Sequence, residues 1–315
     1  MVGAVPVVDA IVIGRNEGAR LLACLASLRG QVRRVIYVDS GSVDGSVPAA
    51  RGLGAEVLAL DLAQPFTAAR ARNAGLGALI ADPPEFVQFV DGDCVLDAGW
   101  IATGLAGFAA HPRAVVVCGR RRERFPKVSI YNRLADLEWA TPVGQADACG
   151  GDALMRFDAV QAVAGYRAGL IAGEEPELCL RLRRAGGEVW RLDAEMTLHD
   201  AALLRFGQWW RRSVRAGHAF AEGAALHRGH WQAEVRRALI WGALVPLGVV
   251  VAGLVHPALW LTGLIYPLQW LRLARRGGGV WAFYSVLGKF PEAQGAIGYY
   301  LRRGLGRRAQ IIEYK

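Results

Sequence analysis

The stretch "FVDGDCV" (residues 89–95) places two carboxylates, Asp91 and Asp93, one residue apart at the end of an apolar run. The run "FVQFV" (residues 86–90) is typical of a buried β-strand. In open α/β sheets, ligands bind beyond the carboxyl ends of the strands. Two carboxylates held there suit a hard divalent cation, which prefers oxygen ligands and keeps positions open for phosphate oxygens. Alone, the pair also fits a solvated Asp-Gly turn, so the choice between a cation site and a turn depends on the neighbouring motifs.

The first two thirds of the chain alternate short β-branched runs with helical patterns. Expected helices cover residues 18–30, 67–81 and 173–187, and expected strands cover residues 10–14, 34–38, 55–60, 86–90, 114–118 and 188–192. Such alternation predicts an α/β fold with a mixed, mostly parallel, Rossmann-like sheet and helices on both faces.

Composition and charge narrow the possible partners. The chain has 315 residues, of which 53% are hydrophobic, and a formal net charge of +9. This composition supports a large core and predicts an anionic partner. The basic residues gather near the apolar segments, which favours anionic lipid over nucleic acid. The five cysteines are widely spaced without a CxxC pair, which argues against a disulfide framework and a structural zinc site.

The composition changes after residue 237, where residues 238–271 contain no Asp, Glu, Lys or Arg. A straight helix of that length would measure about 50 Å, longer than the roughly 30 Å hydrocarbon core of a bilayer. Proline disfavours helix at the residue before it, so His256-Pro257 is the expected break. Arginines flank both ends, which predicts a hairpin or re-entrant pair entered from the cytoplasmic face. A buried helical core of a soluble domain is the alternative.

These features divide the chain into an expected catalytic domain (residues 1–230) and a membrane-associated helical region (residues 231–315). In the second region, residues 280–315 mix aromatic and basic side chains, as expected for an amphipathic tail on the membrane surface. The first residues lack the basic and apolar regions of a signal peptide. We therefore expect the protein on the cytoplasmic face of the inner (plasma) membrane.

Three further polar motifs follow predicted strands or open a predicted helix. Asp39 directly ends the second strand, and the small residues after it would let a ligand approach the backbone. Asn16 and Glu17 follow the first strand. Arg72 and Asn73 lie near the start of a helix, where arginine contacts phosphate or a base edge, or forms a solvated face.

The order and spacing of these motifs over roughly residues 8–215 resemble the family 2 glycosyltransferases of GT-A fold. The resemblance rests on "RNE", "VDSGSVDGS", "ARNAG" and "FVDGDCV", the last as the DxD motif. It implies that Asp39 binds the base of a nucleotide-sugar donor, with Asn16, Glu17, Arg72 and Asn73 nearby. It also implies that Asp91 and Asp93 hold Mn²⁺ or Mg²⁺ against the diphosphate, which supplies the positive charge between the two carboxylates.

The family expects an acidic pair at a helix start, and "GEEPELCLRL" occupies that place. The resemblance makes Glu175 the general base of inverting transfer, beside Glu174, although a Glu-Glu pair replaces the usual Glu-Asp. Glu177 is the fallback, with a possible place near the acceptor. On the residues alone, the three acids also fit a helix N-terminus, where negative charge is favourable.

The resemblance also assigns roles after the last predicted strand. His199 would complete the metal site, although a lone histidine can equally be structural. Arg211 and Arg212, in "QWWRRSVRAGH", would clamp the diphosphate with Gln208 and Arg215. Arg212 stands where processive synthases carry the tryptophan of QxxRW, which weakens a polymerase interpretation. An interfacial helix with Trp209 and Trp210 at headgroup depth is compatible with either role.

The acceptor site of similar enzymes corresponds to residues 137–155. Trp139 would stack on a sugar face or pack as an ordinary aromatic, and Gly150 and Gly151 would let the backbone approach the acceptor. The arginines of "GRRRERF" (residues 119–125) could contact a lipid diphosphate or form a solvated loop, and we expect the loop.

The resemblance therefore implies a membrane-associated, metal-dependent inverting glycosyltransferase of polysaccharide biosynthesis. Its donor would be a UDP-, GDP- or dTDP-linked sugar, and its acceptor a polyprenyl-diphosphate-linked glycan. The alternatives are a polyprenyl-phosphate sugar synthase and a non-catalytic membrane scaffold. A dinucleotide-dependent oxidoreductase is disfavoured because no GxGxxG follows the first strand.

Overall fold

We describe residues 6–306 from a computed structural model of the chain. They divide into two compact units, one running to Leu170 and from Glu174 to Ala202, the other containing Ile171–Gly173 and the residues from Leu203 onward. The boundary near residue 202 groups the helix that follows it with the C-terminal helices, whereas the sequence suggested a boundary at 230.

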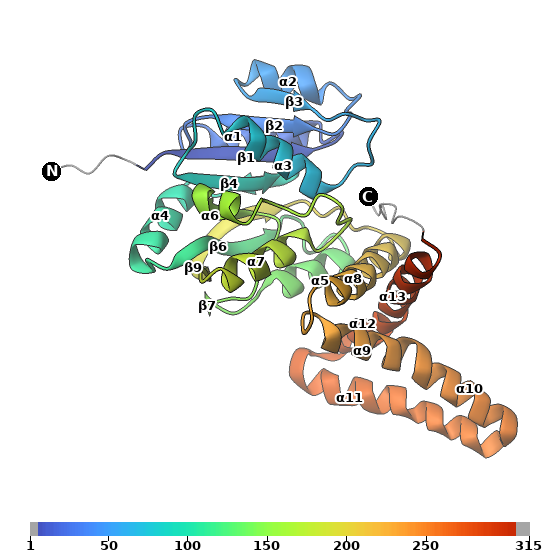
Figure 1. Cartoon of the computed structure of the whole chain (residues 1–315). Coiled ribbons are helices and arrows are strands. Elements are labelled where there is room, and N and C mark those ends of the chain that lie inside the picture. Colours follow the sequence, from blue (N-terminus) through green and yellow to red (C-terminus); the bar gives the residue numbers. More distant parts are fainter. Residues whose placement is uncertain (1–5, 307–315) are drawn as a thin grey trace. The chain divides into compact units, whose positions relative to one another are not determined.

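The first unit is built on a sheet whose order is β3-β2-β1-β4-β8-β6-β9-β5, with β7 paired to β9 (Figure 1). The expected strands are present as β1 (Val8–Gly14), β2 (Val35–Asp39), β3 (Glu56–Ala59), β4 (Phe86–Asp91), β6 (Ala114–Glu123) and β9 (Glu188–His199). The central strands form because their apolar runs are buried on both faces, as in β1, where every residue but Gly14 is buried, whereas the edge strand β3 has no buried residue.

The sheet is mixed, as expected, but its parallel character is concentrated in the first half. Strands β3, β2, β1 and β4 are parallel to one another, and β6 is parallel to β9. Three short strands that the sequence did not reveal run antiparallel to their partners: β5 (Cys94–Leu96), β7 (Gly144–Gln145) and β8 (Ala153–Arg156). Insertion of β8 between β4 and β6 brings residues around 152 beside the end of β4.

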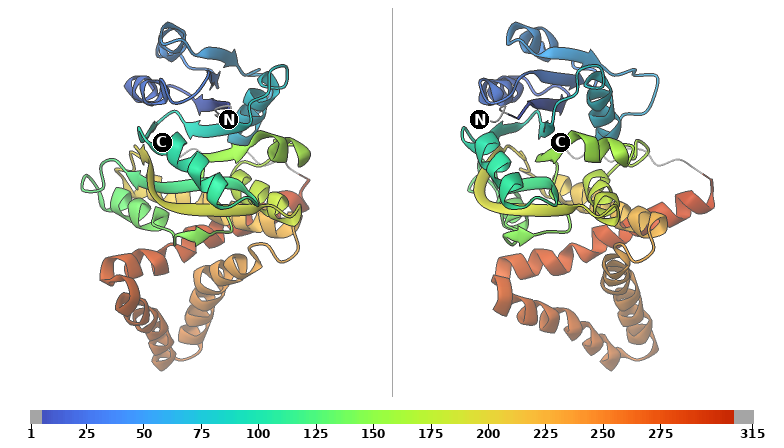
Figure 2. Two further views of the ribbon diagram at one scale, coloured as in Figure 1. Left: turned by 90° about the vertical axis from the view of Figure 1, so that its left-hand side faces the viewer. Right: turned by 60° about the vertical axis from the view of Figure 1, so that its left-hand side comes forward.

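Helices cover both faces of this sheet. The first unit contains α1 (Ala19–Leu28), α2 (Ser46–Gly52), α3 (Ala68–Ala78), α4 (Trp100–Ala110), α5 (Ile130–Trp139), α6 (Phe157–Ala162) and α7 (Glu174–Arg184). The chain moves outward through β1, β2 and β3 and then returns to β4. Because parallel crossovers are right-handed, α1 and α2 lie on one face and α3 on the other, as Figure 2 shows.

The second unit is helical. It contains α8 (Phe206–Leu226), α9 (Gln232–Leu239), α10 (Val245–Val255), α11 (Ile265–Gly277), α12 (Gly279–Leu287) and α13 (Lys289–Gly304). Close approach of α8 and α13 requires glycine, because a Cβ atom on Gly217 would lie 1.9 Å from the Glu292 carbonyl oxygen. Residues 307–315 of the expected amphipathic tail lie outside the described residues. The described part of the tail forms α12 and α13.

The apolar segment forms two arms that meet at His256-Pro257, the expected break (Figures 1 and 2). The first arm continues from α9 through a π-helical turn (Ile240–Leu244) into α10, and the second passes from a 3₁₀ helix (Pro257–Leu264) into α11. In residues 245–277, all of which the structure describes, Gly253 alone is buried. The alternative of a buried helical core is therefore wrong for this segment.

One helix in the described part of the chain, the continuous Gln232–Val255, is long and apolar enough to cross a membrane. Its 24 residues would span about 36 Å. Leu254 and Val255 at its end are each 77% exposed. The arm therefore presents apolar side chains outward from a helix of membrane-spanning length.

Candidate active site

The carboxyl ends of three parallel strands bring the expected donor-site residues to one edge of the sheet. In the strand register, Gly14 of β1 pairs with Asp39 of β2, and Ile13 of β1 pairs with Asp91 of β4. The loops after these strands therefore start at the same level, as the sequence predicted.

Asp39 is buried and fixed by local hydrogen bonds. Its Oδ2 accepts from the backbone N–H groups of Gly41 (2.9 Å) and Ser42 (3.0 Å), and its Oδ1 accepts from the Tyr37 hydroxyl (3.0 Å). Asn16 ties the first loop to the second, because its Oδ1 accepts from the Val43 N–H (2.8 Å). Glu17, next along, forms an ion pair with Arg20 (2.7 Å). The base-binding role of these residues stays a prediction.

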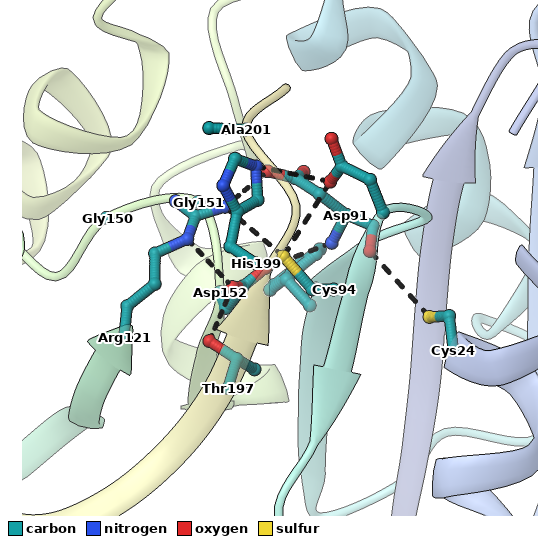
Figure 3. A network of polar contacts seen from close by, with 12 residues as sticks. Cys24, Asp91, Cys94, Arg121, Gly150, Gly151, Asp152, Thr197, His199 and Ala201 are labelled. Carbon is teal, nitrogen blue, oxygen red and sulfur yellow. Dashed lines mark hydrogen bonds and ion pairs between the residues drawn. The ribbon is translucent and has the colours of Figure 1, made fainter. Parts of the chain in front are cut away.

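Two arginines hold the first carboxylate of the DxD motif, and Figure 3 labels one of them, Arg121. Asp91 Oδ1 lies 2.8 Å from Arg72 Nη2, and Asp91 Oδ2 lies 3.0 Å from Arg121 Nη2. Burial favours the neutral acid, but the two guanidinium groups outweigh it and lower the pKa of Asp91. Asp91 is therefore an anion at neutral pH, with positive charge on both of its oxygens.

Sequence reasoning missed two members of this network. Arg121 was expected in a solvated loop, but its side chain is only 15% exposed, because β6 continues through residue 123 and carries it into the sheet. The same expectation fits Arg122 better, since its side chain is 46% exposed and pairs with Glu195. The alternation of inward and outward side chains along a longer β6 was the signal available in the sequence.

The second missed residue is Asp152, which is fully buried. It accepts hydrogen bonds from the Asp91 backbone N–H (3.0 Å) and the Thr197 hydroxyl (2.9 Å), and it lies 3.2 Å from Arg121 Nε. Figure 3 shows these contacts converging from three strands. Asp152 thereby fixes the backbone of the DxD motif and the direction of the Arg121 side chain.

The expected glycine pair lies against this network. A Cβ atom on Gly151 would lie 2.8 Å from Asp91 Oδ2 and 3.2 Å from Arg72 Nη2, so only glycine fits without displacing the ion pairs. Gly150 has a φ of 99°, a conformation that favours glycine. The close approach predicted for these glycines is thus to the acidic cluster; whether an acceptor also lies there stays a prediction.

Asp93 and His199 form the other half of the cluster. Both are more than 90% buried, and His199 Nε2 lies 3.3 Å from Asp93 Oδ1. Cys94 pairs with His199 across β5 and β9, which fixes the distance between the two strands. Carboxylate oxygens and an imidazole nitrogen suit Mn²⁺, and the carboxylates suit Mg²⁺. Asp93 and His199, with Asp91 beside them, therefore fit the expected divalent cation.

The three glutamates at the start of α7 have different surroundings. Glu174 is buried in an ion pair with Arg72 (2.8 Å), and Glu177 is buried between Arg181 (2.7 Å) and Arg167 (2.9 Å). Glu175 is partly buried, and its carboxylate has no ion pair and no hydrogen bond to another residue among residues 6–306. Burial, reinforced by the charge of Glu174, raises the pKa of Glu175 to about 7. Of the three acids, Glu175 is the one free to exchange a proton near neutral pH.

Trp139 and Asn73 also lie around the cluster. The Trp139 ring packs edge-on against His199, with centroids 4.8 Å apart, and Arg121 lies 5.1 Å from the Trp139 ring centroid. Asn73 donates to the Tyr166 carbonyl (2.7 Å) and accepts from the Tyr166 N–H (2.8 Å), which favours a structural role. The proposed diphosphate-binding residues, Arg211 and Arg212, belong to α8 of the second unit.

Residues 9–163 match the sequence profile of glycosyl transferase family 2. The chain contains a family 2 glycosyltransferase domain. This match covers the three parallel-strand loops, the DxD motif and the Gly150–Asp152 segment, of which the last two contribute to the acidic cluster.

Curated relatives agree with this assignment. The pre-mycofactocin glycosyltransferase of Mycobacterium tuberculosis is 28% identical over 233 residues, 70% of this chain and 48% of the relative. Succinoglycan biosynthesis protein ExoA of Rhizobium meliloti is 28% identical over 200 residues, 56% of this chain and 58% of the relative. The chain thus spans about half the length of the curated relatives it matches.

A solved structure has the same fold over nearly the whole chain. The mannosyltransferase PcManGT from Pyrobaculum calidifontis, in complex with GDP-Man and Mn²⁺, matches with a TM-score of 0.64 at 17% identity. The alignment covers 94% of this chain and 87% of that chain. The GT-A type of α/β fold expected from the sequence is therefore confirmed.

Proposed function

We propose that this chain is a metal-dependent, inverting glycosyltransferase that moves a sugar from a nucleoside-diphosphate donor to a hydroxyl group. The observation that supports it best is that Arg72 contacts both the DxD motif and the acidic pair at the start of α7. This one guanidinium joins Asp91 of the DxD motif to Glu174, while the adjacent Glu175 has no partner among the described residues. Arg72 thus connects the proposed cation-binding cluster to the acidic pair that contains the proposed base.

The proposed chemistry assigns one task to each group. Glu175, once ionised, takes the proton from the acceptor hydroxyl, and the acceptor oxygen attacks the anomeric carbon as the bond to the diphosphate breaks. Asp93 and His199, with Asp91, would hold Mn²⁺ or Mg²⁺, which supplies positive charge for the leaving diphosphate. Arg72 keeps Glu174 neutralised, so that the acidic pair has one structural and one reactive member.

The donor site would use the loops after β1 and β2. Asp39 would bind the nucleotide base, with Asn16 and Glu17 beside it, and Trp139, whose ring packs against His199, would stack on a sugar face. Arg211 and Arg212 would bind the diphosphate, as arginine favours bidentate contacts to phosphate. PcManGT was solved with a guanine nucleotide sugar, but its likeness to this chain carries over the fold alone.

We also propose that the second unit attaches the enzyme to the cytoplasmic face of a membrane. The exposed apolar arms between Arg237 and Arg272 would enter the bilayer, and the arginines at their ends would meet anionic headgroups. A lipid-linked glycan, such as a polyprenyl-diphosphate sugar, is then the acceptor that this enzyme would meet. This acceptor would place the enzyme in polysaccharide assembly.

Calorimetry on the full chain in detergent tests the donor and metal proposals. UDP, GDP and dTDP are titrated with Mn²⁺ or with EDTA into the wild type, Asp93→Asn and the exposed control Asp97→Asn. We expect metal-dependent binding of one nucleotide class, lost in Asp93→Asn and kept in Asp97→Asn. Equal nucleotide affinity with Mn²⁺ and with EDTA, and in the wild type and Asp93→Asn, would contradict a metal-dependent site.

Vesicle flotation tests the membrane proposal separately. The wild type should float with phosphatidylglycerol vesicles, and replacing Leu254 and Val255 with Asp should weaken flotation. Matched Asp substitutions of Val43 (91% exposed) and Leu62 (69% exposed), on the first unit, should not change it. If the wild type remained at the bottom of the gradient while the vesicles floated, membrane attachment would be contradicted.

A further inference from the structure

Glu123 lies directly opposite the candidate metal ligand His199. Glu123 ends β6, His199 ends β9, and the two residues are register partners in this parallel pair. The Arg124 N–H donates to the His199 carbonyl (2.8 Å), which fixes the backbones together at this point. Glu123 is 3% exposed, so its carboxylate is held inside the protein.

The carboxylate of Glu123 is rigidly oriented. Oε1 accepts from the Phe125 N–H (3.0 Å) and from Asn132 Nδ2 (3.1 Å). Oε2 accepts from the Ala201 N–H (2.9 Å) and faces the His199 ring, 4.0 Å from Nδ1. A carboxylate oxygen accepts more than one hydrogen bond, so Oε2 retains capacity on the histidine side.

One nitrogen of the His199 ring lacks a hydrogen-bond partner among the described residues. Its Nε2 faces Asp93, whereas its Nδ1 is buried and has no hydrogen-bond partner among the described residues. An imidazole that gives one nitrogen to a metal carries its proton on the other, and that proton is normally donated to a carboxylate or carbonyl. Glu123 Oε2 is the carboxylate oxygen that lies on that side.

We propose that Glu123 is a positioning residue for the metal site: when His199 binds the cation, the 4.0 Å separation closes, Oε2 accepts a hydrogen bond from Nδ1–H of His199, and Nε2 is thereby kept directed toward Asp93. This inference rests on the proposed metal-dependent function. It extends that function by assigning a residue that does not itself contact the cation or the substrate. The competing explanation is purely structural, since three hydrogen bonds to Glu123 also stabilise the ends of β6 and β9.

Mn²⁺ affinity, measured by calorimetry on the full chain in detergent, separates the two explanations. Glu123→Gln keeps the size and one acceptor oxygen but removes the charge that faces His199. We expect the Kd for Mn²⁺ to rise by about 10- to 100-fold, as is typical when the partner of a metal-binding histidine is changed. Asp136→Asn is the matched control, because Asp136 accepts from the Glu123 backbone N–H (3.0 Å) at the same strand end. It should leave the Kd unchanged.

A double-mutant cycle with His199→Ala makes the test specific. If Glu123 acts through His199, Glu123→Gln should have no further effect on the Kd once His199 is removed. Equal Mn²⁺ affinity in the wild type and Glu123→Gln, or equal losses with and without His199, would overturn the inference. Should Glu123→Gln fail to fold, Glu123→Asp keeps the charge but withdraws it from His199, and we expect weakened Mn²⁺ binding there too.

The outcome also distinguishes this inference from the function on which it rests. A wild type that binds Mn²⁺ while Glu123→Gln binds it equally well refutes only the role of Glu123. A wild type that binds no Mn²⁺ refutes the metal-dependent function, and the positioning role with it.

Discussion

Arg72 and Glu174 form a buried ion pair, with Nη1 2.8 Å from Oε1, while the same guanidinium contacts Asp91 through Nη2. The side chain of Arg72 is 3% exposed, so water cannot replace it. Arg72→Met would leave two acidic groups close together without their cation. We expect the free energy of unfolding to fall by about 3–5 kcal/mol, measured by chemical denaturation in detergent.

An exposed arginine provides the control for this change. Arg51→Met on α2 should lower the free energy of unfolding by less than about 0.5 kcal/mol. Equal stability of Arg72→Met and the wild type would mean that the ion pair at the centre of the site is not formed.

Replacing the unpartnered glutamate should affect catalysis and not donor binding. For Glu175→Gln we expect kcat to fall by at least about 100-fold, the lower range for loss of a general base. The Kd of the donor nucleotide should stay within about threefold, which corresponds to less than about 1 kcal/mol. Steady-state kinetics and calorimetry measure the two effects, with the exposed Glu56→Gln as control. Retained activity in Glu175→Gln would favour a phosphate acceptor, as in a polyprenyl-phosphate sugar synthase, because phosphate needs no base.

The pH profile should report the same carboxylate. Burial disfavours the charged form and raises the pKa of Glu175 to about 7, and only the ionised form accepts a proton. Activity should therefore be lost as the pH falls through about 7, at roughly tenfold per unit well below it. Initial rates between about pH 5.5 and 8.5 would show this limb in the wild type. A profile that stays flat below pH 7 would exclude Glu175 as the base.

Gly151 should be intolerant of a methyl group because of its contact with Asp91. The added Cβ of Gly151→Ala would displace Asp91 Oδ2 or Arg72 Nη2, and we expect nucleotide affinity to fall at least about tenfold, or about 1.4 kcal/mol. Gly169→Ala has open space and an ordinary φ, so it should bind the nucleotide as the wild type does. Calorimetry with Mn²⁺ compares the two, and equal affinities would show that the cluster can shift at little cost.

Helix packing in the second unit depends on Gly217. A Cβ atom on Gly217 would lie so near the Glu292 carbonyl that Gly217→Ala must push α8 and α13 apart. Overpacking typically costs about 1–3 kcal/mol, which should lower the melting temperature of the full chain in detergent. Gly207→Ala, on the same helix in open space, should be neutral or slightly stabilising because alanine favours helix. Equal melting temperatures of Gly217→Ala and Gly207→Ala would contradict the prediction.

Much of the fold is encoded in short-range patterns. The six apolar runs expected as strands and the three expected helices are present, because burial on both faces and helical periodicity are visible within a few residues. The break at His256-Pro257 likewise follows from the local chemistry of proline. Strands β5, β7 and β8 were not predictable, since segments of two to four residues carry no periodic signal and form only against long-range partners.

The sequence by itself determined which residues end a strand or open a helix. It thereby identified Asp39, Asp91 and Asp93, and the three glutamates at the start of α7, as candidates. Only the tertiary structure decided how these charges are shared. Asp152 and Arg121 join Asp91 because β8 inserts between β4 and β6. The Glu177–Arg181 pair could have been predicted from its i,i+4 spacing on one helix. Glu174 instead pairs with Arg72, which precedes it by 102 residues, and Glu175 remains unpaired, because such long-range pairing depends on which side chains meet in space.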